Sequence, residues 1–270
     1  MKPGVLDPQE GSDLPGLGGL AHTGYTLPSR HVPTASAGRA LLLIAAFLAV
    51  YALFDVLPIV LPKEDVVEGL RWGDLIDVPL VFLLVGAYVL LGLEAGLWRT
   101  TLLKLASAFS LVVLVQGHGI HIAANTISAY LDTSSSAWRP AYFLDERWGH
   151  AEIHTGLILQ ALLFIAASRP TAGPARLSSA AKPVLLSLAT VYGLFLTADA
   201  IEGQSVALML PAGVVLASIG FAKRGDSSLY RIFFASAFAV AVLALAAYWL
   251  WHGGFPEHDW HVWQELPLGL

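Results

Sequence analysis

The sequence predicts an all-α integral membrane protein with seven transmembrane helices, its N-terminus in the cytoplasm and its C-terminus outside. Of its 270 residues, 56% are hydrophobic and only 13% are charged, with a mean hydropathy of +0.66. Soluble domains carry about 25% charged residues. The apolar residues also form long continuous runs rather than the stripes of an amphipathic helix, which is typical of segments that cross a bilayer.

A spanning helix needs about 20 predominantly apolar residues. Seven segments meet this requirement, and we expect spans over residues 39–61, 75–97, 102–130, 148–168, 183–202, 204–222 and 230–252. Only Glu202, Gly203 and Gln204 separate the fifth and sixth segments, and Gly203 can supply the tight turn. Pro211 interrupts the sixth segment, which membrane helices tolerate. The spans together predict a seven-helix domain over residues 38–253.

The two ends of the chain lack the apolar content of the spans. Residues 1–37 are rich in glycine, proline and polar residues, and they predict a disordered cytoplasmic tail. Residues 254–270 predict a short tail at the outer membrane surface, because Trp260 and Trp263 are of a type that favours the headgroup region.

The distribution of lysine and arginine predicts the orientation. With the N-terminus inside, 11 of the 15 basic residues lie on the inner side and four on the outer side. The inner ones are Lys2, Arg30, Arg39, Arg99, Lys104, Arg169, Arg176, Lys182, Lys223, Arg224 and Arg231, and the outer ones are Lys63, Arg71, Arg139 and Arg147. Cytoplasmic loops carry the excess of positive charge, which favours this orientation. High alanine and leucine content suggests a bacterial source, so we expect a multi-pass protein of the inner (cytoplasmic) membrane.

Two stripes of polar residues interrupt the hydrophobic spans. They are His118, His121 and Asn125 on the third span, and Glu146, His150 and His154 at the start of the fourth. The spacings are i, i+3, i+7 and i, i+4, i+8, so the members of each stripe share a helix face. In the predicted topology both stripes lie toward the outer side of the membrane. Ionisable groups in hydrocarbon are costly, which marks this region as the candidate functional site.

Further polar residues lie at the same depth on other spans. They are Asp55, Asp77, Asp199, Glu202 and His252. We expect Asp199 and Glu202 to be catalytic, as general bases. Asp55, Asp77 and His252, together with Asn125 and Glu146, are expected to complete or orient the coordination sphere of a metal ion.

The four histidines of the stripes are the candidate metal ligands. They are His118, His121, His150 and His154. Imidazoles one helical turn apart lie about 5–6 Å from each other and can bind one divalent ion. Nitrogen and oxygen ligands suit Zn²⁺, Fe²⁺, Mn²⁺ or Cu²⁺, and the absence of cysteine excludes thiolate sites. An alternative interpretation is a polar network that ties the helices together.

Three functions are compatible with this pattern. The first is a membrane-embedded, metal-dependent enzyme with a site open to the outer leaflet, which hydrolyses or, as a second choice, oxidises a membrane lipid or amphiphilic small molecule. The second is a metal-ion or proton-coupled transporter, and the third is a haem-binding electron-transfer subunit. The net charge of −5 leaves no broad basic surface, so nucleic acid is not an expected partner.

The seven-span plan with histidines and acids inside the membrane resembles the alkaline ceramidase and adiponectin-receptor-like membrane hydrolases. The resemblance implies a zinc ion held by three histidines, with an aspartate and a serine. In this chain the HxxxH pair, His150 and His154, lies on the fourth span rather than the last. The serine and aspartate of those families have no match in position, so the resemblance assigns no residue.

Overall fold

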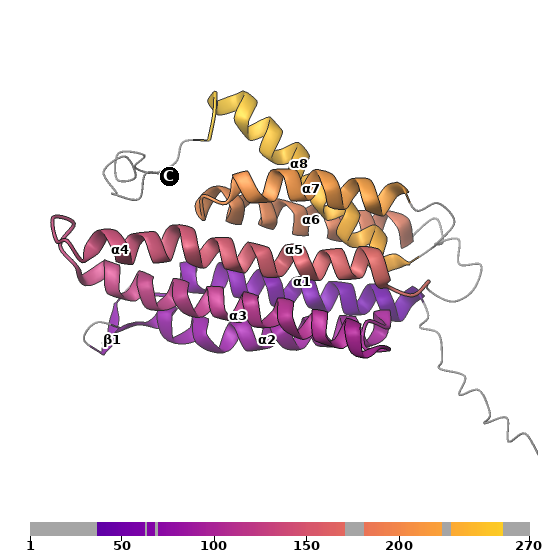
Figure 1. The fold of residues 1–270 in the computed structure, drawn as a ribbon, viewed down its shortest axis with the longest axis horizontal. Coiled ribbons are helices and arrows are strands. Elements are labelled where there is room, and N and C mark those ends of the chain that lie inside the picture. Colours follow the sequence, from indigo (N-terminus) through magenta and orange to yellow (C-terminus); the bar gives the residue numbers. More distant parts are fainter. Residues whose placement is uncertain (1–36, 63, 68–69, 171–180, 223–227, 256–270) are drawn as a thin grey trace, which may run out of the picture. The chain divides into compact units, whose positions relative to one another are not determined.

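Helices make up almost all of the described chain, as Figure 1 shows. The computed structural model describes residues 37–62, 64–67, 70–170, 181–222 and 228–255, which belong to one unit of the chain, residues 34–270. The elements are α1 (Ala37–Val60), β1 (Asp65–Val67), β2 (Leu70–Arg71), α2 (Trp72–Ala95), α3 (Thr101–Tyr130), α4 (Trp138–Phe143), the π-helical turn η1 (Leu144–Gly149), α5 (His150–Ala167), α6 (Ala181–Glu202), α7 (Val206–Ala222) and α8 (Leu229–His252).

The helices have the length and composition of a multi-pass membrane protein. Among the described residues six continuous helices are long and apolar enough to cross a bilayer, and α7, with 17 residues, is a shorter apolar helix. The prediction of a helical chain with several helices able to cross a membrane is therefore confirmed, and its helices are consistent with a multi-pass membrane protein. One small element departs from the all-α prediction: β1 and β2 form an antiparallel hairpin in which Asp65 pairs with Arg71.

The fourth membrane helix begins ten residues earlier than hydropathy predicts. α4, η1 and α5 form one continuous helix, Trp138–Ala167, instead of the expected 148–168. Its first turns contain Asp145, Glu146 and Arg147, which resemble a polar loop in the sequence. The helix continues through them because Asp145 and Glu146 face a cavity rather than the surrounding hydrocarbon.

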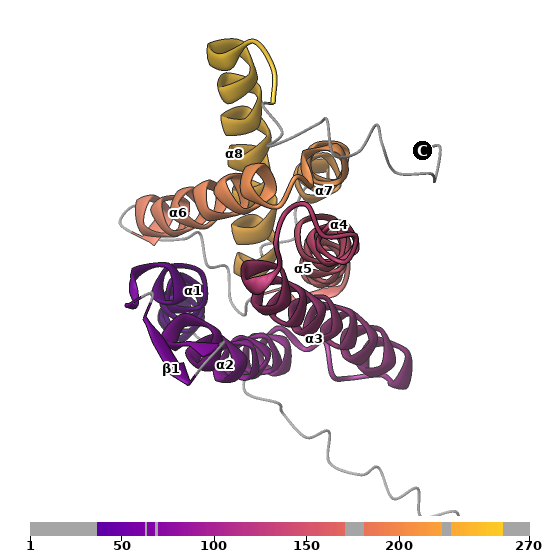
Figure 2. The same ribbon diagram turned by 90° about the vertical axis from the view of Figure 1, so that its left-hand side faces the viewer.

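Most of the helices of the bundle pack in pairs. α1 packs on α2, α3 on the α4–α5 helix, and both α6 and α7 on α8 (Figure 2). The hairpin and α4 lie at the same end of the bundle (Figure 1), which we call the hairpin end. The site described below lies at this end.

Glycines allow α3 and α5 to approach closely. A Cβ atom on Gly117 would lie 2.6 Å from the backbone nitrogen of Ile153, and one on Gly156 would lie 2.8 Å from the nitrogen of Leu114. Small residues at helix contacts are a common means of close packing in membranes. The close approach brings the histidines of the two helices together.

A layer of aromatic side chains fills the bundle on the side of the cavity away from the hairpin end. Its fully buried members are Phe47, Tyr51, Tyr88, Phe164, Tyr192, Phe233 and Phe234. The rings of Phe47 and Tyr88 meet edge to face at 4.8 Å, and the hydroxyl groups of Tyr88 and Tyr192 are hydrogen-bonded at 2.9 Å. These contacts join α1, α2, α5, α6 and α8 in one buried aromatic layer.

The predicted tails fall almost entirely outside the described residues. Positions 1–36 and 256–270 are not described. The expectations for a cytoplasmic tail over 1–37 and an interfacial tail over 254–270 therefore stay predictions.

Candidate metal centre

A cavity of about 370 Å³ opens among α1, α2, α3, η1, α5 and α6 at the hairpin end. Ten of the eleven residues singled out in the sequence line it: Asp55, Asp77, His118, His121, Asn125, Glu146, His150, His154, Asp199 and Glu202. His252 does not line the cavity; it is exposed at the end of α8, where its ring packs on Tyr248 at 4.3 Å. Segments distant in sequence thus bring their acids and imidazoles to one place.

Three side chains form a compact group of potential metal ligands. His121, Asp145 and His150 each offer one ligand atom, and these atoms lie within 4.8 Å of one another. The Nδ1 atom of His121 is 2.7 Å from Oδ1 of Asp145, and the rings of His121 and His150 meet edge to face with their centroids 4.5 Å apart. We call this group the metal triad.

The orientation of the triad atoms favours a common third partner. Nδ1 of His121 and Oδ1 of Asp145 are at hydrogen-bond distance, yet their alignment is not that of a hydrogen bond, and neither has another partner. Asp145 is only 3% exposed. Buried polar atoms without a partner are costly. An ion between these atoms would satisfy both, because ligands of one metal point at the ion rather than at each other.

The π-helical turn η1 places Asp145 beside His150. The two residues are five positions apart, which in an α-helix separates them by about 140° around the axis. In a π-helix the hydrogen bonds run from i to i+5, so residues five apart become neighbours along the axis. The turn ends at Gly149, where α5 begins with His150. Single π-turns inside α-helices occur frequently at functional sites.

Two glycines hold the imidazoles of the triad in place. A Cβ atom on Gly149 would lie 3.0 Å from the Cβ of His121, so the backbone of η1 packs directly on that residue. Gly203, in the turn between α6 and α7, lies against the ring of His150, and a Cβ there would overlap the imidazole. The ring of His150 and the Cβ of His121 therefore each lie against a glycine, which restricts the movement of both side chains.

The other two histidines have different surroundings. Nε2 of His118 lies 3.3 Å from both the carbonyl oxygen and Oδ1 of Asp77, while its Nδ1 has no hydrogen-bond partner. His154 lies one turn beyond His150 on α5, is only 1% exposed and has no hydrogen-bond partner for either ring nitrogen. Neither belongs to the metal triad, although both line the cavity.

A pair of aspartates forms the opposite wall. Asp55 on α1 and Asp199 on α6 both line the cavity, and Tyr51 donates from its hydroxyl to Oδ2 of Asp199 at 2.5 Å. Glu202, one turn beyond Asp199, is exposed at the end of α6.

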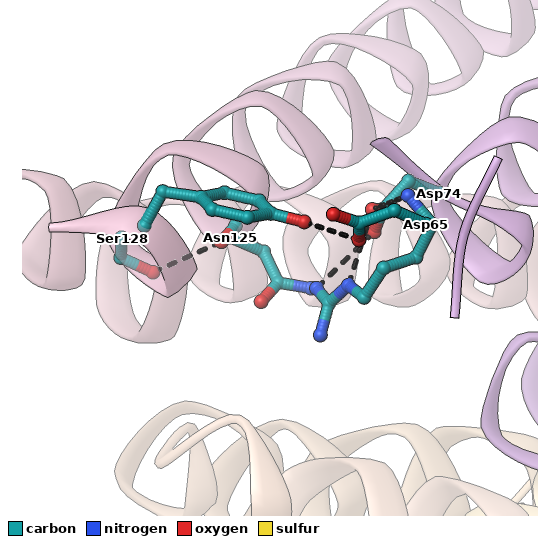
Figure 3. A network of polar contacts seen from close by, with 6 residues as sticks. Asp65, Asp74, Asn125 and Ser128 are labelled. Carbon is teal, nitrogen blue, oxygen red and sulfur yellow. Dashed lines mark hydrogen bonds and ion pairs between the residues drawn. The ribbon is translucent and has the colours of Figure 1, made fainter. Parts of the chain in front are cut away.

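The mouth of the cavity is held by contacts between the hairpin, α2 and α3. Arg71 donates to Asp74 from its backbone N–H and from two guanidinium nitrogens, at 3.0–3.3 Å. Beside them Tyr130 donates to Asp65 at 2.6 Å, and the hydroxyl of Ser128 donates to the carbonyl oxygen of Asn125 at 3.1 Å (Figure 3). The Arg71–Asp74 contacts join the hairpin to α2, and the Tyr130–Asp65 bond joins the end of α3 to the hairpin.

Sequence reasoning missed Asp145, Tyr51 and the Arg71–Asp74 pair. Asp145 falls off the face that carries Glu146, His150 and His154 under an α-helical period, so only a π-turn makes it a ligand. Tyr51 could have been found, since it lies four residues before Asp55 on one face of α1. The Arg71–Asp74 contact depends on the β-hairpin, which hydropathy does not predict.

Comparison with protein-family models, with curated proteins and with solved structures found no match to this chain. The site must therefore be interpreted from its own geometry. The described residues show a membrane-type helical protein with a histidine–aspartate group that could hold a metal ion.

Proposed function

We propose that the protein is a membrane-embedded, metal-dependent enzyme whose site opens toward the outer leaflet and hydrolyses an amphiphilic substrate. The observation that carries the proposal is the metal triad, whose three potential ligand atoms lie within 4.8 Å of one another, with Nδ1 of His121 and Oδ1 of Asp145 buried.

The ligand set agrees with a catalytic metal. Two imidazole nitrogens and one carboxylate oxygen suit Zn²⁺, Fe²⁺ or Mn²⁺. Three protein ligands with a further position left for water or substrate are typical of catalytic zinc sites, and a bound divalent ion lowers the pKa of its water toward neutrality. The cavity supplies room for a substrate next to the triad.

Acidic side chains on the cavity wall would handle the protons. In hydrolysis the oxygen of water bonds to the carbonyl carbon of the substrate, the bond to the leaving group breaks, and a proton passes from water to that group. We propose that Glu202 or Asp199 accepts this proton and delivers it, as a general base and then a general acid. Tyr51 would position Asp199 through their hydrogen bond.

The topology proposed for this function has all seven apolar helices in the membrane of a bacterium, with the N-terminus in the cytoplasm. The hairpin end then faces outward, and the cavity is reached from the outer surface or leaflet. The excess of lysine and arginine in the loops of the opposite end supports this orientation.

The other two functions have less support. An ion that crosses the bundle would have to pass the aromatic layer, whose rings are buried and packed on one another. A haem between α3 and α5 would need a porphyrin plane between His121 and His150, whose rings already touch at 4.5 Å.

Metal binding by purified variants tests the proposal. The protein is stripped with a chelator in detergent, reloaded with Zn²⁺, Mn²⁺ or Fe²⁺ under suitable redox conditions, and its bound metal is measured by mass spectrometry. We expect about one ion per chain and loss of the ion in His121→Ala, Asp145→Asn and His150→Ala. His252→Ala is the control, because His252 lies outside the cavity.

The isosteric change Asp145→Asn separates metal loss from misfolding. It keeps the shape of the side chain, so the elution volume and helical content should match the wild type. If the three variants keep a full complement of metal, the triad is a structural network and the proposal is wrong.

A further inference from the structure

We infer that the cavity binds, next to the metal ion, an amphiphile whose head group is a protonated amine. This inference rests on the proposed function and names the chemical class of its substrate. Three separate features of the cavity support it: the charge of its wall, its hydrogen-bonding groups and an apolar side that leads to the bilayer.

The wall of the cavity is strongly acidic. Seven carboxyl groups line it: Asp55, Asp74, Asp77, Asp145, Glu146, Asp199 and Glu202. Among the described residues Arg71 is the one arginine or lysine that lines it, and three contacts engage it with Asp74 (Figure 3). Arg71 compensates one of these charges, and a divalent ion would compensate two more. The formal charge stays negative after both, which disfavours anionic head groups and favours a cation.

The hydrogen-bonding groups also favour a ligand that donates. His154 is buried, lines the cavity and has no hydrogen-bond partner at either ring nitrogen. Nδ1 of His118, which also lines the cavity, has no hydrogen-bond partner either. A neutral imidazole offers one acceptor nitrogen, and carboxylates only accept. Apart from imidazoles, the side-chain donors that the described part of the chain places on the wall are Arg71, which is engaged, and the amide of Asn125. An ammonium group brings three donors and no acceptor, which complements this wall.

A second metal ion fits the surplus charge less well. Metal ions need several ligands at fixed short distances. Within the described residues, only His121, Asp145 and His150 form a group of three potential ligands close enough to share an ion. An ammonium group has no such requirement and can contact acceptors in varied directions.

The apolar part of the ligand has a route to the bilayer. Phe54, Pro58, Ile59 and Leu61 line the same cavity from α1 and the residue that follows it. Ile59 is 60% exposed, so this wall continues onto the outer surface of the helix, which faces lipid in a membrane. An alkyl chain could therefore lie along α1 while its head lies between the acids and the triad.

Binding of three probes with the same chain tests the inference. The probes are dodecylamine, dodecanol and dodecanoate, added at pH 7 to the zinc-loaded protein in nanodiscs of zwitterionic lipid. Binding is measured by calorimetry, with empty nanodiscs subtracted. We expect saturable binding of dodecylamine, at least ten-fold tighter than that of dodecanol, and no saturable binding of dodecanoate. Equal binding of all three, or tighter binding of dodecanoate, would overturn the inference.

Variants show where the amine lies. Asp199→Asn and His154→Phe should each weaken dodecylamine at least ten-fold while the bound zinc stays at one ion per chain. Glu64→Gln is the matched control, because Glu64 is an exposed acid on the hairpin segment that does not line the cavity. Unchanged binding in both cavity variants, or two zinc ions per wild-type chain, would contradict the proposed amine site. If the wild type bound no zinc, the metal centre itself would be wrong. The failure of the proposed function can therefore be distinguished from the failure of the amine site.

Discussion

Asp145 and Glu146 show how one neighbouring pair decides the chemistry of the site. The α-helical period of the sequence favours Glu146, whereas the π-turn gives the ligand position to Asp145, whose Oδ1 lies 2.7 Å from Nδ1 of His121. Asp145→Asn should therefore lower zinc affinity by more than about 100-fold, and Glu146→Gln by about 10-fold, the lower end of what is expected for a group outside the coordination sphere. A competition titration with a chromogenic chelator measures both. The reverse order would show that the helix keeps its α-helical register when metal binds.

The histidines themselves were predictable, because helical spacing and membrane depth are properties of the sequence alone. His118, His121, His150 and His154 all line one cavity, as their placement on two neighbouring spans suggests. Their division into roles was not predictable. His118 contacts Asp77, and His154 lies apart from the triad. These differences depend on which face each of α2 and α5 turns toward its neighbours, and the sequence does not show this.

At the scale of the helix, the contact between α3 and α5 is set by glycine. Gly117 faces the backbone of α5, whereas Gly119 on the same helix has no atom near a new Cβ. Gly117→Ala should destabilise the protein by about 1–3 kcal/mol through overpacking. Gly119→Ala should leave the stability unchanged or raise it by up to about 1 kcal/mol, since alanine favours the helix. Thermal unfolding in detergent checks both, with zinc affinity as a second measurement. Equal melting temperatures would show that the close approach of the two helices is dispensable.

Sequence analysis found the helices more readily than their ends. Hydropathy identifies α1 and α8 because every turn is apolar, but it places the start of the fourth span too late. The polar residues from Asp145 to Arg147 lower the hydropathy there, while the folded helix shelters two of them in a cavity built by other helices. No local pattern contains that information.

At the scale of the whole molecule, the asymmetry of charge predicts which end faces outward. Because the chain has no cysteine, single cysteines can be labelled without background. Ser134→Cys, between α3 and α4, should react with a membrane-impermeant maleimide in intact cells. Ser178→Cys, between α5 and α6, should react only after the cells are opened. The opposite pattern would place the metal triad toward the cytoplasm and remove the argument for an outer-leaflet substrate.

The π-turn also has a consequence for tracing this site through evolution. Its effect is to let a D-x-x-x-x-H spacing present both side chains on one face. A chain with one residue fewer in that stretch would reach the same arrangement with D-x-x-x-H in an ordinary α-helix. A homologue that differs by deletion of this one codon would conserve the centre, and an alignment that forbids gaps inside helices would miss it.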